Sequence, residues 1–344
     1  MSGRLLPTPS AGFDPWANAD KAVGLGPQVP QMTQPQSLSL ADRLMHRPYL
    51  LLVVTNLLWG GNVVAGKAAV GNIDPYALMV LRWSGALLVL LPFAIGPVRR
   101  DWPVIRRRWW LYLFYGVVGY ATFNILVYIA AHFTSGINNA IDQVTINILV
   151  MTINFALFRT RVRPLQLLGV ALTIVGVALT ATHGDLRRIL ALDINFGDFL
   201  VLCACLAYAI YSVALRWRPV TSWLSFLFAS FAGALLASLV FQLTLGGGIG
   251  HLLTTVPAVT PLGWAIVLYT VLFPSLVSQM LYVRGVDLIG ANRASLFLNL
   301  IPLFGAIGSV LILGEQLQPF HLVAGILIVI GIGLAEWSAR RRPV

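Results

Sequence analysis

The sequence predicts an all-α integral membrane protein with ten transmembrane helices, arranged as two inverted five-helix repeats around a central cavity. Three observations predict this class: the composition, the spacing of the apolar segments and an internal repeat. Of the 344 residues, 58% are hydrophobic and 10% are charged, and the mean hydropathy is +0.82. Soluble domains carry roughly 45–50% apolar and about 25% charged residues, so a soluble globule is excluded.

Apolar segments follow one another with short interruptions from Tyr49 onward. A helix that crosses a hydrocarbon layer of about 30 Å needs roughly 20 residues. Segments of about ten alternating residues, which are typical of a membrane β-barrel, do not occur in the sequence. The spans are predicted at 49–69, 75–95, 109–131, 137–158, 164–182, 197–217, 222–245, 261–284, 290–313 and 319–338.

The arginines between these spans predict the orientation. If the N-terminus is cytoplasmic, the outside loops hold only Arg187 and Arg188, and the other loop arginines lie inside. We therefore expect a multi-pass protein of the inner (plasma) membrane with both termini in the cytoplasm. Residues 1–47 are rich in proline and lack an apolar run, which predicts a disordered cytoplasmic tail, and 340–344 form a basic cytoplasmic tail.

The net charge of +11 could indicate a nucleic-acid partner. The arginines, however, form short clusters between long apolar runs and not one patch. We therefore expect contact with the lipid bilayer and no nucleic-acid partner.

An internal repeat divides the chain. The residues around Gly169 match those around Gly325 at an offset of 156, and Ser-Gly-Ala-Leu-Leu at 84–88 resembles a segment at 231–236. The predicted repeats are therefore 48–182 and 183–339, with five spans each. Because five is odd, the second repeat must enter the membrane the opposite way up. Inverted repeats with a site near the midplane are typical of transporters.

Several motifs resemble the EamA-domain type of the drug/metabolite transporter superfamily. They are Trp59-Gly-Gly-Asn-Val-Val-Ala-Gly-Lys67, Leu81-Arg82 within the second span, and Ala294-Ser-Leu-Phe-Leu-Asn-Leu-Ile-Pro302 followed by Gly314-Glu315. The resemblance covers residues 50–338. It implies ten helices, cytoplasmic ends, a central cavity and movement of small metabolites, commonly export of amino acids.

The first repeat departs from this pattern at two positions. Ile146 stands where the family has a proline, equivalent to Pro302, and Arg159 stands at the position of Glu315. Because the two repeats are inverted, Arg159 falls on the cytoplasmic side and Glu315 on the outside, which explains the second departure. The missing proline predicts that the helix over 137–158 is straighter than the helix over 290–313.

Polar side chains recur along single faces of several predicted helices. Such groups are costly in lipid and usually face a bundle interior or a cavity. The alternative is that they only join helices, which contributes roughly 0.6–2 kcal/mol each. The repeat offset pairs four of them with partners in the other half, and this favours a cavity. The predicted substrate-binding residues are Trp59, Asn62, Asn124, Tyr128, Gln143, Asn147, Tyr208, Tyr211, Gln279, Tyr282 and Asn299.

Three further residues are candidates for gating or coupling. Arg82 belongs to the family pattern, where we interpret it as structural. For Asp142 we rank an ion pair with Arg82 or Lys67 first, ahead of a contact with a substrate amine or a proton site. Pro302 interrupts its helix beside Asn299, which indicates a gate or a site there, or else a packing kink.

These features predict a secondary carrier that exports small metabolites, with amino acids or related amphipathic compounds as the first candidates. The alternatives are a passive channel or facilitator, which the bulky aromatics in the polar stripes disfavour, and a polytopic lipid-modifying enzyme, for which no reactive constellation is present. There is no Gly-rich phosphate loop, so ATP is not the direct energy source. We expect no cofactor and no metal, a small-molecule substrate, and function as a monomer.

Overall fold

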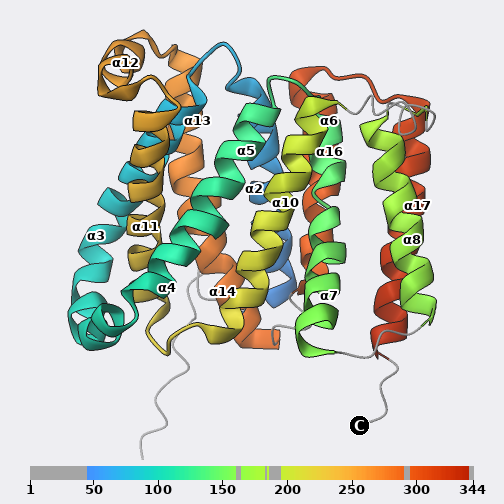
Figure 1. Cartoon of the computed structure of the whole chain (residues 1–344), viewed down its shortest axis with the longest axis horizontal. Coiled ribbons are helices and arrows are strands. Elements are labelled where there is room, and N and C mark those ends of the chain that lie inside the picture. The colour runs from blue at the N-terminus through green and yellow to red at the C-terminus, as the bar shows by residue number, and fades with distance from the viewer. Residues whose placement is uncertain (1–44, 160–163, 183, 186–194, 290–294, 341–344) are drawn as a thin grey trace, which may run out of the picture.

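The computed structural model describes residues 45–159, 164–182, 184–185, 195–289 and 295–340, and every regular element in these ranges is helical. Most of the helices stand side by side and roughly parallel (Figure 1). In chain order they are α2 (Pro48–Ala68), α3 (Pro75–Arg107), α4 (Trp109–Phe114), η2 (Tyr115–Thr122), α5 (Phe123–Ala130), α6 (Gly136–Asp142), α7 (Thr145–Phe158), α8 (Pro164–Ala181), α10 (Phe196–Ala214), η3 (Leu215–Trp217), α11 (Trp223–Thr244), α12 (Gly248–Thr255), η4 (Val256–Ala258), α13 (Pro261–Leu272), η5 (Phe273–Val277), α14 (Ser278–Ile289), η6 (Ser295–Asn299), α16 (Leu300–Leu313) and α17 (Pro319–Arg340).

Seven helical segments are long and apolar enough to cross a membrane, and three shorter apolar helices accompany them. The seven are Pro48–Ala68, Pro75–Arg107, Trp109–Ala130, Gly136–Phe158, Phe196–Trp217, Trp223–Thr244 and Pro261–Ile289. The shorter ones are Leu167–Thr180, Phe297–Leu313 and Pro319–Leu334. The predicted all-α membrane class is confirmed, and the protein is a multi-pass membrane protein.

The helix ends follow from side chains that satisfy the first N–H groups. Asp74 accepts hydrogen bonds from the backbone N–H groups of Tyr76 and Ala77 at 3.0 and 2.9 Å and so caps α3, which begins with Pro75. Helix α16 ends at its C-terminus with Gly314, which has a left-handed φ of 70°, a conformation that suits glycine at this position.

Two long helices contain π-helical segments at mid-height. The segment η2 joins α4 to α5, and η5 joins α13 to α14. In η5, Pro274 lacks an N–H group, and the hydroxyl of Ser275 donates to the carbonyl of Thr270 at 2.8 Å. Single π-helical turns of this kind are frequent at functional sites.

The helix over 136–158 is interrupted although it lacks the proline. The helix over 290–313, with which it was expected to compare as the straighter one, begins in residues 290–294, which lie outside the described residues. Helix α6 ends at Asp142 and α7 begins at Thr145. The break is possible without proline because i→i−3 bonds replace the α-helical ones: the N–H of Val144 reaches the carbonyl of Ile141, and that of Asn147 reaches Val144, both at 3.1 Å. The 3₁₀ segment η6 likewise precedes α16.

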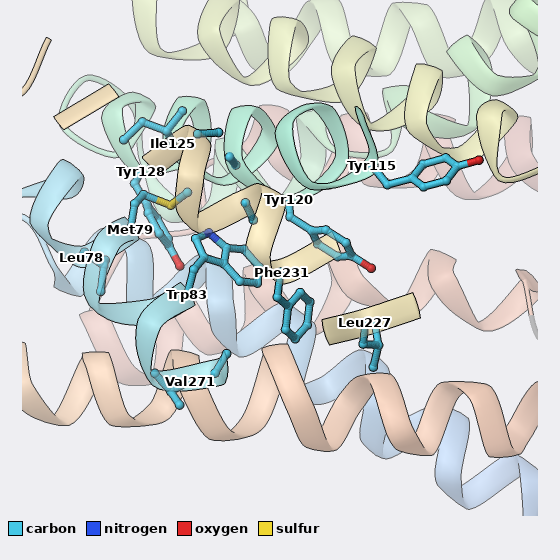
Figure 2. Packing of buried hydrophobic residues seen from close by; sticks show 14 of the residues in the cluster. Leu78, Met79, Trp83, Tyr115, Tyr120, Ile125, Tyr128, Leu227, Phe231 and Val271 are labelled. Carbon is cyan, nitrogen blue, oxygen red and sulfur yellow. The ribbon is translucent and has the colours of Figure 1, made fainter. Parts of the chain in front are cut away.

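Aromatic packing joins α3, η2 and α11 beside the centre of the bundle. Figure 2 shows Trp83, Tyr120 and Phe231 together; their ring centroids lie 5.0 Å (Trp83–Phe231), 5.2 Å (Tyr120–Phe231) and 5.5 Å (Trp83–Tyr120) apart. Elsewhere small residues allow close approach: a Cβ on Gly60 would stand 2.8 Å from the backbone N of Gly305, so α2 and α16 pack nearly backbone to backbone.

Candidate functional site

A cavity of about 110 Å³ lies between helices from the first and second parts of the chain. By volume it has room for on the order of ten water molecules or for one small solute. Seven of the eleven predicted substrate-binding residues line it, together with Arg82 and Pro302. The seven are Trp59, Asn62, Asn124, Gln143, Asn147, Tyr208 and Gln279.

The guanidinium group of Arg82 is held rigidly on the cavity wall. Its Nε donates to the hydroxyl of Ser275 at 2.9 Å. Its Nη1 donates to Oδ1 of Asn124 at 2.7 Å, to Oδ1 of Asn62 at 3.2 Å and to the hydroxyl of Tyr128. The side chain is only 4% exposed. Four neutral oxygens therefore hold one buried cation in a fixed orientation.

The predicted ion pair of Asp142 with Arg82 or Lys67 is not formed. Each cation finds neutral oxygens instead: Nζ of Lys67 donates to the backbone carbonyls of Ala131 and Thr134 at 2.8 and 2.7 Å, near the end of α5. Neither carboxylate oxygen of Asp142 has a hydrogen-bond partner among the described residues. The expectation failed because carbonyl and amide oxygens lie within reach of both cations.

Asp142 is buried beside a second acid that the sequence analysis missed. Asp198, in the first turn of α10, interacts electrostatically with Asp142. One oxygen of Asp198 accepts a hydrogen bond from the hydroxyl of Thr134, and the amide of Asn138 lies beside the same carboxyl group. Asp198 escaped notice because an acid in the first turn of a helix is ordinary, since it complements the helix dipole.

The acid pair connects to the start of α17 through Asn138. Nε2 of His321 and Oδ1 of Asn138 are 2.9 Å apart, and Nδ1 of His321 accepts from the backbone N–H of Gln318 at 2.9 Å. Because Nδ1 is an acceptor, Nε2 must carry the proton and donate to Asn138 in the neutral ring. Nearby, Glu315 accepts from the N–H groups of Gly136 and Ile137 at 2.7 and 2.9 Å, which caps α6.

The rest of the cavity wall is amide and aromatic. Trp59 donates through Nε1 to the carbonyl of Pro274 at 3.0 Å, so the unwound backbone of η5 holds the indole in place. Gln143 donates to Oδ1 of Asn139 at 3.0 Å along its own helix. On the far side, the ring of Tyr208 packs 5.0 Å from that of Phe123.

Five predicted residues lie outside the cavity lining. Tyr128 stands behind Asn62, Tyr211 and Tyr120 share a hydroxyl contact at 3.1 Å, and Tyr282 packs against Trp59. Asn299 accepts from Nδ2 of Asn147 at 2.8 Å and borders a separate apolar groove of about 900 Å³ between α16 and α17. Asp142 is the fifth.

The structure adds lining residues that were not predicted. Ser275 and Tyr120 lie four residues before Gln279 and Asn124, on the same polar helix faces, but they were not among the predicted substrate-binding residues. Trp83, Phe123 and Phe231 carry no such signal, because an aromatic residue in a membrane helix looks the same whether it faces a cavity, a neighbouring helix or lipid.

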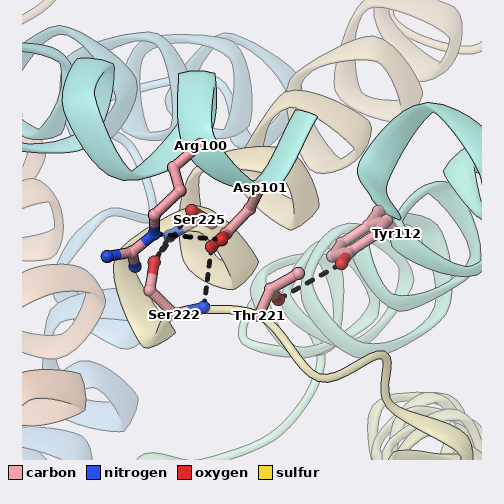
Figure 3. Close-up of polar contacts among 6 residues, drawn as sticks. All are labelled: Arg100, Asp101, Tyr112, Thr221, Ser222 and Ser225. Carbon is pink, nitrogen blue, oxygen red and sulfur yellow. Dashed lines mark hydrogen bonds and ion pairs between the residues drawn. The ribbon is translucent and has the colours of Figure 1, made fainter. Parts of the chain in front are cut away.

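At the opposite end of the bundle from the start of α6, polar contacts join the end of α3 to the start of α11 (Figure 3). Asp101 accepts from the backbone N–H of Ser222 at 2.8 Å and pairs with Arg100 at 3.4 Å. The hydroxyls of Tyr112 and Thr221 are 3.2 Å apart. These contacts connect helices of the first part of the chain to the second on the predicted cytoplasmic side.

The comparison with known proteins bears directly on this arrangement. The model of the EamA-like transporter family matches residues 46–182 and, a second time, residues 195–336. The chain belongs to the EamA-like transporter family. The resemblance inferred from the first-helix and second-repeat motifs is therefore confirmed.

Relatives of this EamA-like protein are named transporters, and the family and its relatives together support a transporter. The chain is 24% identical over 302 residues to the uncharacterized transporter YyaM of Bacillus subtilis (strain 168), covering 85% of this chain and 94% of YyaM. It is 26% identical over 286 residues to the uncharacterized transporter YetK of the same strain, covering 82% and 84%. A solved structure described as "Crystal structure of protein" aligns with TM-score 0.58 and 18% identity, over 86% of this chain and 99% of that one.

Proposed function

We propose that this protein is a secondary transporter that exports small metabolites, amino acids or related amphipathic compounds, by alternating access between two inverted repeats at 48–182 and 183–339. In this proposal ten helices cross the inner (plasma) membrane, both termini are cytoplasmic, and the protein acts as a monomer without a cofactor. The observation that carries the proposal is the cavity, because its wall draws polar residues from both repeats.

Two pairs of repeat-equivalent residues support the inverted arrangement. Asn124 and Gln279 are related by an offset of 155 residues, and Trp59 and Tyr208 by an offset of 149, and all four line the cavity. The π-helical segments η2 and η5 also occupy matching positions, since an offset of 155 carries Tyr120 onto Ser275. An in-plane pseudo-two-fold axis would bring such positions together around one site.

The two alternatives gain less support from the site. A passive channel needs a continuous open path, whereas the bulky rings of Trp59, Tyr208 and Phe231 border this cavity and narrow it. A lipid-modifying enzyme would need a nucleophile or acid–base pair near one membrane surface. The buried Asp142–Asp198 pair is cut off from solvent by its neighbours, so it suits coupling better than catalysis.

We place the coupled proton on Asp142. An ionised carboxylate without donors in a dry interface is costly, and the pair with Asp198 brings two like charges together. Release of the proton would then require that α6 and α10 separate, which ties protonation to opening of this end. Arg82, by contrast, donates to four neutral oxygens through Nε and Nη1.

Counterflow in proteoliposomes tests the transporter. Vesicles loaded with an unlabelled amino-acid mixture should take up labelled amino acids transiently above equilibrium, which a channel cannot do. Absence of counterflow for every solute, with passive equilibration instead, would favour the channel.

Cysteine labelling tests the inverted topology separately. Single cysteines at residues 106 and 187 should react from opposite sides of the membrane. Labelling from the same side would contradict the inverted repeats.

A further inference from the structure

The wall of the central cavity carries one fixed cation, and its neighbours leave one nitrogen of that cation unused. In Arg82, Nε and Nη1 are engaged by Ser275, Asn62, Asn124 and Tyr128. Nη2 has no hydrogen-bond partner among the described residues, and it is not among the polar atoms that are closed off from all open space. Because Arg82 borders the cavity, we infer that the two N–H donors of Nη2 face it.

No negative charge balances this cation locally. The described residues that line the cavity include no aspartate or glutamate, and the four oxygens that hold Arg82 are all neutral. The ring of Trp83 adds a cation–π contact at 4.8 Å, which stabilises the charge without neutralising it. A buried guanidinium with donors to spare and no counter-ion attracts an anion of matching shape, and carboxylates match it best.

The remaining wall limits what that anion can be. A phosphorylated metabolite carries about two negative charges and would need more than one cation, whereas Arg82 alone borders the cavity among the described residues. The aromatic rings of Trp59, Phe123 and Tyr208 suit an apolar or aromatic body. The volume of about 110 Å³ limits that body to a small one.

We propose that Arg82 is the carboxylate-binding residue of this transporter, so that its substrates are small monocarboxylates with an apolar or aromatic body, as zwitterionic amino acids or as simple organic acids. This inference rests on the proposed transport function and names its substrate chemistry. It also assigns Arg82 a role in binding, beyond the structural role that the family pattern suggests.

A set of four matched solutes tests the assignment: leucine, leucinamide, 3-methylbutylamine and 4-methylpentanoate. They share one branched body and differ in the carboxylate and the amine. Binding to the purified protein in nanodiscs is measured by the ligand-induced shift in melting temperature and by calorimetry. We expect the two carboxylates to bind about 10- to 100-fold more tightly than the amide and the amine, which corresponds to loss of a charge-assisted hydrogen bond.

Leucine and 4-methylpentanoate together distinguish the two forms of substrate. Tighter binding of leucine indicates that the site also holds the ammonium group, and tighter binding of 4-methylpentanoate indicates a preference for simple acids. Either result supports the carboxylate assignment. Equal or tighter binding of the amide or the amine overturns it.

Two variants locate the effect at Arg82. Arg82→Gln removes the cation, and Asn62→Asp supplies an internal carboxylate beside it while keeping an oxygen for Arg82 and Tyr128 to donate to. Both should abolish the preference for carboxylates, and Asn62→Asp keeps the test open if Arg82→Gln does not fold. The matched control is Arg218→Gln, which removes a cation that stacks on Phe226 away from the cavity and should leave the preference unchanged. Preference retained in Asn62→Asp would overturn the proposal.

Counterflow with a mixed solute library separates this inference from the proposed function. Transport restricted to amines or neutral solutes would refute the carboxylate assignment and leave the transporter standing. Absence of counterflow for every solute would refute transport itself.

Discussion

Arg82 and Asp142 are both almost fully buried in the same bundle, yet their surroundings differ in every respect. Arg82 borders the cavity and donates to four neutral oxygens. Asp142 is the last residue of α6 and does not line the cavity, and neither of its carboxylate oxygens is paired among the described residues. The cation borders a cavity, and the acid is enclosed between helices.

The difference indicates how a carrier can divide binding from coupling. A cation that is satisfied by its neighbours stays charged in every step, so it can recognise an anionic solute repeatedly. An acid without donors is stable only while it holds a proton or gains access to water. The two regions should therefore respond in opposite ways when their polarity is removed.

The largest effect is expected from loss of an acceptor for Arg82. Asn124→Leu removes the 2.7 Å bond to Nη1 and the bond from Nδ2 to the carbonyl of Tyr120. A hydrogen bond to a charged group contributes about 1.5–3 kcal/mol, so the variant should unfold at a clearly lower temperature. Thermal unfolding in detergent measures this. An unchanged melting temperature would show that Arg82 is held by its other partners alone.

Asp142→Asn should act in the opposite direction on stability and strongly on coupling. The amide cannot ionise beside Asp198 and needs no proton, so the melting temperature should hold or rise. Stimulation by a pH gradient should vanish while solute exchange continues. The measurement is transport in proteoliposomes with and without an imposed gradient.

Asp198→Asn is the matched control for Asp142, because Asp198 accepts a hydrogen bond from Thr134. Because the neutral amide of asparagine accepts more weakly than a carboxylate, the hydrogen bond from Thr134 is weakened, and the melting temperature should fall. If the pH gradient still stimulates transport in Asp142→Asn, Asp142 has a structural role only.

The sequence predicted those residues of the cavity wall whose polar side chains stand out within apolar segments. Asn62, Asn124, Gln143 and Gln279 were identified because amides are conspicuous within apolar segments. The hydrogen-bond partners of Arg82, and the lack of one for the Asp142 carboxyl group among the described residues, could not be predicted, because they depend on how α3 meets α2, α5 and η5.

The break between α6 and α7 was missed for a different reason. A proline announces a kink, but a turn held by i→i−3 bonds at Val144 leaves no such mark in the sequence. The change from α-helical to 3₁₀ hydrogen bonds between α6 and α7 depends on tertiary packing, and local helix propensity carries little information about it.

A third prediction uses the residue next to Asp142. Gln143 lines the cavity. Its repeat partner Asn299 does not line it, and Asn299 accepts a hydrogen bond from Asn147. Gln143→Ala should raise the apparent KM about 5- to 12-fold, as expected for one hydrogen bond of roughly 1–1.5 kcal/mol, with stability close to wild type. Asn299→Ala should instead lower the melting temperature with little change in KM. The reverse pattern would move the binding site toward Pro302.

The smallest effect is expected at the other end of α6, where an acid does have donors. Glu315 accepts from the N–H groups of Gly136 and Ile137, so Glu315→Gln should cost about 0.5–2 kcal/mol through a weaker cap. Asp101→Asn, which weakens a single backbone contact at the opposite end of the bundle, should cost at most about 1 kcal/mol. Melting temperatures of both variants, measured beside Asp142→Asn, decide whether donors make the difference. Equal effects from the three acids would mean that hydrogen-bond donors do not set their contribution, and the contrast between Arg82 and Asp142 would then lose its physical basis.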